Sequence, residues 1–426
     1  MSPVVELAPQ SIPPGVVVRE EPSDTRFVAA ARTSVAAFLV EGTDETVVHN
    51  MSTWADFDKR FTYSTVDNDL DRIKLSKTAW ASVRGWFENG GGECYIVLVD
   101  GSDQSSSGEF ERSEAGGAEG TDADSQSISL VSTYAGTRAM GSPTGVAALE
   151  SCEVQMVIAP DMDTDPAHID AKAIVAHCRT MGDRIALLHF DKDVTVEGIV
   201  DGLANFGLSD LEELRCATAY YPWISVPDPA MNGQFMSIPP TGHVAGIWAR
   251  VDSSRGIHKA PANEGLRGVT ALAFDMSGPE QAKINDLGVN GLRSFRASGL
   301  RVWGARTLAA SNVSDVENGY LNVRRTINFI KESIRQSTEW VVFEPNNDAL
   351  QTSVQVTISN FLTSLWRRGA LVGATPDQAF YVRCDEGNNP PEDVYQGKLT
   401  CDVGVAIVRP AEFVTFRVTQ IINQSS

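Results

Sequence analysis

The acids of the string DMDTD, at 161–165, are the residues of this sequence with the clearest potential for chemistry. They follow an apolar run that is typical of a strand, and enzymes that form an aspartyl-phosphate place an acidic nucleophile at such a point. Asp161 and Asp163 are therefore candidates for an α/β hydrolase or phosphatase, although Pro160 intervenes between the strand and the acids. A calcium loop would need Gly at its sixth position and an acid at its twelfth, where this chain has Pro and Lys. The structural interpretation is that Asp163–Asp165 cap the helix that follows.

Other catalytic and cofactor motifs are absent from the sequence. The string nearest to a GxSxG nucleophile elbow, Gly141–Gly145, has Pro143 in the nucleophile position. There is no HExxH and no P-loop. His168 and His177 fall on different faces of a predicted helix, which argues against a zinc pair. The cluster Gly90–Gly92 ends a helix, whereas phosphate cradles open one. We therefore expect no metal, no cofactor and no enzymatic activity.

Composition excludes several classes of partner. The 426 residues carry a formal net charge of -20, which would repel the phosphates of nucleic acid. No apolar run reaches the roughly 18 to 20 residues of a membrane helix, so we expect no direct membrane insertion. The N-terminus lacks the basic and apolar regions of a signal peptide. The six cysteines are scattered without a CxxC pair, which predicts buried, reduced thiols and synthesis in a reducing cytoplasm.

Against this acidic background, one predicted helix within 301–371 carries a basic stripe. Its apolar face recurs at helical spacing at Val323, Ile327, Ile330 and Ile334. A neighbouring stripe, about 100° around the helix, holds Arg324, Asn328, Lys331 and Arg335. The stripe suggests a docking face for an acidic partner. The alternative is that these cations pair with acids of the same subunit.

A second helix is predicted after Asn346–Asp348, any of which can cap its first turn. Its apolar face is formed by Leu350, Val354, Ile358, Phe361 and Leu365. Arg367 and Arg368 suit the negative end of its dipole, and Gly369 supplies a left-handed stop. Between the two helices, the run WVVFEP at 340–345 is predicted to form a short strand.

The elements before these helices alternate between strand and helix. Strands are predicted at 35–40, 94–99, 154–160, 184–190 and 216–226. Helices are predicted at 69–88, 166–181 and 194–206, the second with Ile169, Ala173 and Ala176 inside. This order implies a largely parallel sheet. Residues 227–263 are rich in turn formers, which predicts a long ordered loop with one helix near 244–252.

Both ends of the chain form strands that lack a partner nearby in the sequence. The first run is 15–21, with Val16, Val17 and Val18. The second run is 412–422, with Phe413, Val414, Phe416 and Val418. Strands with open edges must be paired or covered, and one solution is to join a sheet in a neighbouring subunit.

Composition and pattern divide the chain into six parts, with an α/β and α+β fold overall. They are an N-terminal arm (1–22), an N-terminal α/β segment (23–100), an acidic surface insertion (101–145), a middle α/β domain (146–290), a C-terminal α+β core domain (291–410) and a C-terminal strand arm (411–426).

The sequence resembles the contractile tail sheath family, which contractile phage tails, R-type tailocins and phage-derived injection systems share. The N-terminal motifs are PPGVVVREEPS (13–23), TSVAAFLV (33–40) and WFENGGGECYIVLV (86–99). The middle motif is IPPTGHVAGIWARVDSSRGIHKAPAN (238–263). The C-terminal motifs are VWGARTL, YLNVRR, FEPNN, LWRRGAL, AFYVRCD and PAEFVTFRV. They cover most of the chain in the family's order, whereas the acidic insertion is not matched.

The resemblance implies a multi-domain sheath fold and a mechanical role. Sheath subunits stack as hexameric rings in a six-start helix around an inner tube, and terminal arms add strands to sheets of neighbouring subunits. Baseplate and terminal cap proteins are the further partners. On triggering, the lattice contracts and drives the tube through a target envelope without a nucleotide. The resemblance makes Arg324, Lys331, Arg335, Arg367 and Arg368 candidates for the tube-facing surface. A tube or other non-contractile shell protein is the remaining structural alternative.

Overall fold

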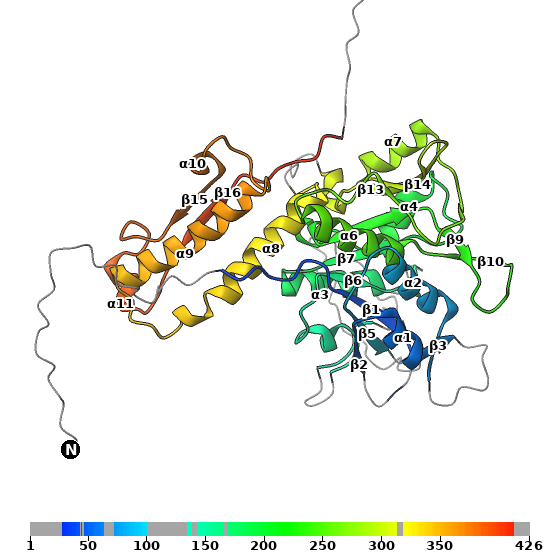
Figure 1. The fold of residues 1–426 in the computed structure, drawn as a ribbon, viewed down its shortest axis with the longest axis horizontal. Coiled ribbons are helices and arrows are strands. Elements are labelled where there is room, and N and C mark those ends of the chain that lie inside the picture. The colour runs from blue at the N-terminus through cyan, green and yellow to red at the C-terminus, as the bar shows by residue number, and fades with distance from the viewer. Residues whose placement is uncertain are drawn as a thin grey trace, which may run out of the picture.

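The computed structural model describes residues 28–412, apart from 43, 45–46, 64–71, 100–133, 139–142, 165–168 and 313–317 (Figure 1). The predicted N-terminal arm and all of the predicted C-terminal arm beyond Glu412 lie outside the described residues, as does most of the acidic insertion. The described chain forms a large α/β unit and a smaller C-terminal lobe, joined along one long helix (Figure 1).

The α/β unit is built on a nine-stranded sheet in the order β11-β14-β13-β8-β7-β6-β1-β5-β2. Its strands are β1 (Ala36–Glu41), β2 (Val48–Met51), β5 (Cys94–Val99), β6 (Met156–Ile158), β7 (Ile185–His189), β8 (Ala217–Tyr221), β11 (Glu264–Gly265), β13 (Val289–Phe295) and β14 (Gly299–Trp303). The six central strands from β5 to β13 pair in parallel, whereas β2, β14 and β11 are antiparallel at the two edges. The predicted, largely parallel sheet is confirmed.

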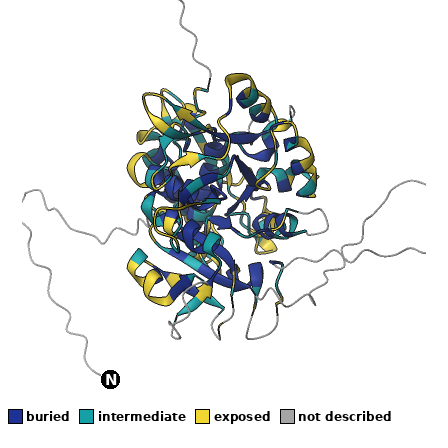
Figure 2. Cartoon of the chain, turned by 90° about the vertical axis from the view of Figure 1, so that its right-hand side faces the viewer, coloured by how far each residue is buried: buried dark blue, intermediate teal, exposed yellow. Residues whose placement is uncertain are grey.

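Helices cover both faces of this sheet, which explains why its strands are apolar on both sides. In β1, Phe38 faces one core cluster and Leu39 faces the other. The first face carries α1 (Trp54–Arg60), α2 (Lys77–Glu88) and α6 (Thr241–Arg255). The second face carries α3 (Asp170–Met181), α4 (Ile199–Asn205), α5 (Leu211–Arg215), α7 (Gly278–Asp286) and the 3-10 turns Gly145–Leu149 and Leu308–Ser311. Burial is accordingly deepest in the sheet itself (Figure 2).

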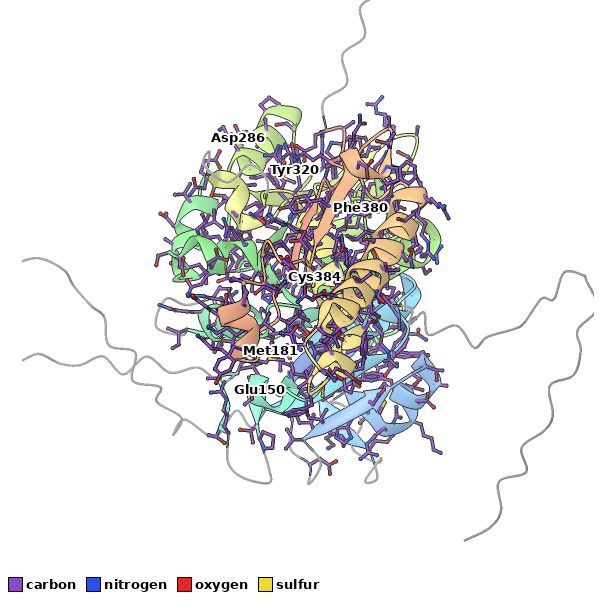
Figure 3. All side chains as sticks on the ribbon, turned by 90° about the vertical axis from the view of Figure 1, so that its left-hand side faces the viewer. Glu150, Met181, Asp286, Tyr320, Phe380 and Cys384 are labelled. Atoms are coloured by element: carbon purple, nitrogen blue, oxygen red, sulfur yellow. The ribbon has the colours of Figure 1, made fainter. Side chains whose placement is uncertain are left out.

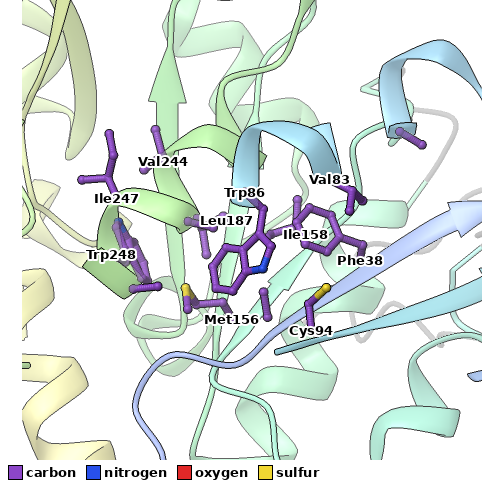
Figure 4. Close-up of a cluster of buried hydrophobic side chains, with 14 of the residues drawn as sticks. Phe38, Val83, Trp86, Cys94, Met156, Ile158, Leu187, Val244, Ile247 and Trp248 are labelled. Carbon is purple, nitrogen blue, oxygen red and sulfur yellow. The ribbon is translucent and has the colours of Figure 1, made fainter. Parts of the chain in front are cut away.

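Close approach of α2 and α6 fixes the first layer. A methyl group at Gly242 would lie 2.4 Å from the Ser82 carbonyl oxygen, and one at Gly246 would lie 2.4 Å from the Trp86 carbonyl oxygen. The two helices can therefore touch backbone to backbone only because these positions are glycine. Trp86 and Trp248, both fully buried, then fill the space between the helices and the sheet (Figure 4).

Several predicted boundaries in the α/β unit are wrong. Ser76 caps α2 by accepting a hydrogen bond from the Ala79 N–H, so the helix begins at Lys77 and not near 69. The residues before it form β4 (Ile73–Leu75), which pairs with β3 (Phe61–Tyr63). Helix α4 is likewise shorter than predicted. Helix α3 buries Ala171, Ile174, Val175 and Cys178, and not the face that contains Ala173 and Ala176.

The predicted strand at 216–226 is two strands. Pro222, which has no N–H to donate, separates β8 from β9 (Ile224–Pro227). Strand β9 leaves the main sheet and pairs with β10 (Phe235–Ile238) and β12 (Ala271–Leu272). The region predicted as a loop with one short helix thus contains a strand, and its helix α6 runs three residues further in each direction.

The C-terminal lobe contains α8 (Leu321–Ser337), α9 (Asp348–Arg367), α10 (Pro376–Ala379), β15 (Phe380–Arg383), α11 (Pro391–Tyr395) and β16 (Asp402–Val405). The predicted cap at Asn347 and the left-handed Gly369 are confirmed. The strand predicted at 340–345 is wrong, because a 3-10 turn (Glu339–Val341) and a bend connect α8 to α9 there. Among the described residues, no helix is long and apolar enough to span a bilayer.

Candidate subunit interface

The C-terminal lobe is built on the pair of helices that the sequence predicts. Phe329 of α8 and Phe361 of α9 face each other with ring centroids 6.0 Å apart, inside a third core cluster. Residues 28–33 lie along α8 and add Ala31 to this cluster. The backbone N–H of Ala31 donates to the Ser333 Oγ at 3.0 Å. The segment that leads to the N-terminal arm is thus held by the C-terminal lobe.

The two ends of the described chain leave from opposite ends of α8. Ser337, the last residue of the helix, donates its hydroxyl to the Ala29 carbonyl at 3.4 Å. Asn322, in its first turn, donates its amide to the Val408 carbonyl at 3.0 Å. The helix has 17 residues, so these contacts lie about 20 Å apart along its axis.

A two-stranded sheet, β15–β16, lies against these helices (Figure 3). Phe380 opposes Val405 and Val382 opposes Val403, and all four side chains pack toward the third core cluster. On the outer face, the ring of Tyr381 covers Gly404, where an added methyl group would lie 2.1 Å from it. The sheet therefore has one face on a core and one face exposed.

The strand register identifies the edge of this sheet that no described strand pairs with. The Ala406 N–H donates to the Ala379 carbonyl at 2.8 Å, so the backbone groups of residues 404 and 402 also face β15. Those of Val403 and Val405 then point away from β15, along the outer edge of β16. The outer edge of β15 is partly covered, because Gln355 of α9 donates to the Val382 carbonyl at 3.1 Å. An open strand edge is a template for another strand.

The basic stripe on α8 turns toward the α/β unit. Arg324 is half-buried and lies near the Cys216 thiol: burial raises the pKa of that thiol, and the positive charge of Arg324 opposes this rise. Lys331 is exposed, with its Nζ 3.6 Å from the point that a methyl group at Gly182 would occupy. Asn328, which the sequence places in the same stripe, is buried.

Arg335 pairs with acids of its own chain. Its guanidinium lies 2.6 Å from Glu332 Oε1 and 3.1 Å from Glu339 Oε1. The Arg335 guanidinium donates hydrogen bonds to the Glu332 carboxylate, and this contact raises the pKa of Arg335 above its usual range. The pairing alternative is thus observed for this residue. By contrast, Arg367 and Arg368 are exposed at the end of α9, and no described residue forms an ion pair with either.

A buried polar contact, which no pattern in the sequence indicates, joins the two parts of the molecule. Arg325 of α8 and Asp252 of α6 form a bidentate ion pair at 2.5 and 2.9 Å, with side chains 3% and 1% exposed. The guanidinium also donates to the Thr33 carbonyl and lies 4.6 Å from the centroid of the Trp248 ring. Periodicity cannot identify such a residue, because Arg325 stands beside the basic stripe and looks like part of a solvated face.

Of the acids at 161–165, Asp161 and Asp163 lie in the described residues, and Asp161 makes a structural contact. Asp161 accepts a hydrogen bond from the Ser76 hydroxyl at 2.6 Å, and burial raises its pKa to about 6. Asp163 is exposed. The predicted capping of the next helix is wrong, because the N-cap of α3 is Ile169. Within the described part of the chain, no group of three or more potential ligand side chains could hold a metal ion.

Two domain models of phage tail sheath proteins match the chain. The model of the central domain matches residues 116–308, and the model of the C-terminal domain matches 314–421. The chain belongs to the phage tail sheath family. It is 31% identical to the tail sheath protein of Burkholderia phage BcepMu over 229 residues, which are 52% of this chain and 45% of that protein. It is 28% identical to the tail sheath protein of Escherichia phage P2 over 183 residues, 42% of this chain and 43% of that protein.

This family member spans less than half the length of those two phage relatives, but it matches two solved sheath subunits along their whole length. One is the sheath of an extracellular contractile injection system, PVC, in the contracted state, with 25% identity and a TM-score of 0.70. The match covers 98% of this chain and 100% of that chain. The other is the contracted helical sheath of the anti-feeding prophage, with 27% identity, a TM-score of 0.69 and coverage of 96% and 99%.

Proposed function

We propose that the chain is a structural subunit of a contractile sheath, which polymerises as stacked hexameric rings around an inner tube and contracts to drive that tube through a target envelope. Its partners are copies of itself, the tube protein, and baseplate and terminal cap proteins. The chain is made in the bacterial or archaeal cytoplasm and assembled into a phage tail or an injection particle. The observation that carries the proposal is the open edge of β16, on a subunit that matches the full length of two sheath subunits.

In this proposal, the terminal arms of neighbouring copies add strands at β16. The inner face of β16, which carries Val403 and Val405, is apolar. The β-branched side chains of an added strand could extend this apolar face. The valines at 16–18 and the alternating run from Phe413 to Val418 have the composition of such strands. Each ladder hydrogen bond contributes about 0.5 to 1.5 kcal/mol net, and the contact repeats in every subunit. A strand ladder also survives a change in subunit orientation while the linking residues bend.

In this proposal, the α/β unit and the C-terminal lobe move together as one rigid body. The buried Arg325–Asp252 pair and residues 28–33 both tie α8 to its surroundings. Breaking the pair would leave a buried charge without a partner, which lowers the stability by several kcal/mol. We therefore place the motion of contraction in the arms, outside the two lobes.

Deletion of either arm tests the proposal. Removal of residues 1–21, or of 412–426, is expected to give a folded subunit that remains small in sedimentation. A matched control keeps the arm length and replaces Val16, Val17 and Val18 with Ser, which removes strand propensity alone. This variant is expected to lose polymerisation as well. Long polymers from either deletion would contradict the proposal.

The tube-facing surface is the second part of the proposal. Arg367 and Arg368 suit this role best, because exposed cations without a close partner can meet an acidic surface and release it again. Arg324, Lys331 and Arg335 remain candidates, although their contacts lie within the subunit. We expect that Arg367→Glu with Arg368→Glu abolishes tube-dependent assembly at unchanged subunit stability. Arg324→Glu with Lys331→Glu is the matched comparison, and we expect it to abolish tube-dependent assembly as well. If either double variant forms normal extended particles in micrographs, its two residues do not face the tube.

A further inference from the structure

Two of the six free cysteines lie opposite each other at the end of the β15–β16 sheet. The last register pair of that sheet is Arg383 with Asp402, and the next residues outward are Cys384 and Cys401. The pair 379/406 is hydrogen-bonded, so the alternation makes 384/401 a non-hydrogen-bonded pair. The Cα atoms of such a pair are about 4.5 Å apart, which falls within the range that a disulfide spans.

The two thiols are neighbours. Each affects the pKa of the other, and Cys401 packs against the third core cluster, of which Cys384 is a buried member. Cys384 is 2% exposed, whereas Cys401 is only partly buried and is open to a small reagent. Cys94, the one cysteine inside a described strand, opposes Ala36 and Met51 in its register and has no cysteine opposite it there.

The loop between the two cysteines is held closed without a covalent bond. The Asn389 side chain donates to the Thr400 carbonyl at 2.9 Å and accepts from the Thr400 N–H at 2.6 Å. The Asn388 amide donates to Asp402 Oδ2 at 3.1 Å. These bonds fix the backbone on both sides of the pair, so that a bond between the sulfurs requires little movement.

We propose that Cys384 and Cys401 are an oxidation site, at which a small-molecule disulfide such as oxidised glutathione produces a cross-strand disulfide that closes residues 384–401 into a covalent loop. The Cys401 thiolate attacks one sulfur of the reagent, and a glutathione thiolate leaves. The Cys384 thiolate then attacks the Cys401 sulfur, and the second glutathione thiolate leaves. Two protein thiols are oxidised and one glutathione disulfide is reduced, while the two protons released protonate the two glutathione thiolates.

Burial sets the rate of this reaction. It raises the pKa of Cys401 to about 12 and also raises that of Cys384, so the attacking thiolate is scarce at neutral pH. Below the pKa, the thiolate fraction grows about tenfold for each unit that the pH rises, so oxidation is faster at higher pH. The site is therefore inert in a reducing cytoplasm and reacts slowly after release into an oxidising medium.

Thiol counting on the purified full-length chain tests the site. Incubation with excess oxidised glutathione is expected to reduce the six free thiols to four without unfolding. The rate is expected to rise about tenfold between pH 7 and pH 8. Trypsin cuts after Arg383 and Lys398, so the two cysteines fall in separate peptides that only a disulfide joins. Mass spectrometry without reductant should find this linked pair.

Serine variants provide the matched comparison. Cys384→Ser is expected to abolish the linked peptides, and Cys401→Ser repeats the test if the first variant does not fold. Cys152→Ser, which removes another partly buried cysteine, should leave the loss of two thiols unchanged. Six thiols that persist in the wild type, or a linkage that joins other cysteines, would overturn the proposal. Neither result depends on whether the chain assembles.

Discussion

The α/β unit and the C-terminal lobe differ in how completely the faces and edges of their sheets are covered. The nine-stranded sheet has helices on both faces, and its edge strands β2 and β11 have only four and two residues. Short edges discourage pairing with another chain. Among the described residues, the sheet of the C-terminal lobe has two strands, one covered face and an edge of β16 that no strand pairs with. A sheet of two strands is marginal alone, so in our proposal this lobe is the part that another chain completes.

Exposed apolar side chains follow the same division. In the described residues after 317, the large apolar side chains that are exposed are Val342, Phe343, Val356, Val372, Tyr381 and Tyr395. The much longer described part before residue 318 has five. We propose that the α/β unit supplies most of the stability of the subunit and that the C-terminal lobe supplies most of its contacts with other copies.

The ion pair between the two regions gives the largest expected effect. Arg325→Ala leaves Asp252 buried without its partner, which is expected to lower the free energy of unfolding by about 3 to 5 kcal/mol. Denaturant titration measures this loss. The double variant Arg325→Met with Asp252→Leu removes both charges and should recover most of the stability. A single variant as stable as the wild type would break the view that this pair joins the two regions.

A change in the α/β unit should alter stability but not assembly. Burial raises the pKa of Asp161 from 3.8 to about 6, so the folded state binds its proton more tightly than the unfolded state does. The stability that this group contributes is therefore present below about pH 4 and is lost as the pH rises to about 6. Asp161→Asn is expected to remove this slope and to raise the unfolding free energy at pH 7 by about 1 to 3 kcal/mol. Thermal unfolding across pH 4 to 7 measures this pH dependence. Lost polymerisation in this variant would contradict the view that Asp161 affects stability alone.

By contrast, a change in the C-terminal lobe is expected to weaken assembly without lowering the stability of the subunit. Phe343 is fully exposed and has a φ of 72°, a backbone conformation that favours Gly. Phe343→Gly is expected to stabilise the isolated subunit by about 1 kcal/mol, because the left-handed strain is relieved. The same change is expected to weaken polymerisation, because an apolar contact is removed. Phe343→Leu, which keeps an apolar side chain and the strain, is the control; a gain in both stability and polymer length for the Gly variant would contradict this view.

The sequence predicts the framework of both regions but not the way they join. Apolar periodicity located α8 and α9, and the alternation of strands and helices gave the parallel sheet, because burial of one face leaves a regular pattern. The pattern fails at 340–345, where an apolar run forms a 3-10 turn and a bend that expose Phe343. β-Branched and aromatic residues predict a strand only where a partner strand exists, and none is described beside this run.

The candidate site was only partly predictable. Which edge of the β15–β16 sheet stays open depends on the register of its two strands and on Gln355 of a distant helix. The burial of Arg325 depends on Asp252 and Trp248, which lie more than 70 residues away in the chain. Contacts of this kind leave no local signal in a single sequence.

Proline substitution at Val405 is the most direct test of the central claim that the edge of β16 receives a strand from another copy. The Val405 N–H points out of the β15–β16 ladder, so Val405→Pro removes a donor that the subunit itself does not use. Gly404→Pro, which removes a donor that faces β15, is the control and should destabilise the subunit. Our account predicts that Val405→Pro unfolds within a few degrees of the wild type and forms no sheath in micrographs. Sheaths of normal length from this variant would contradict it.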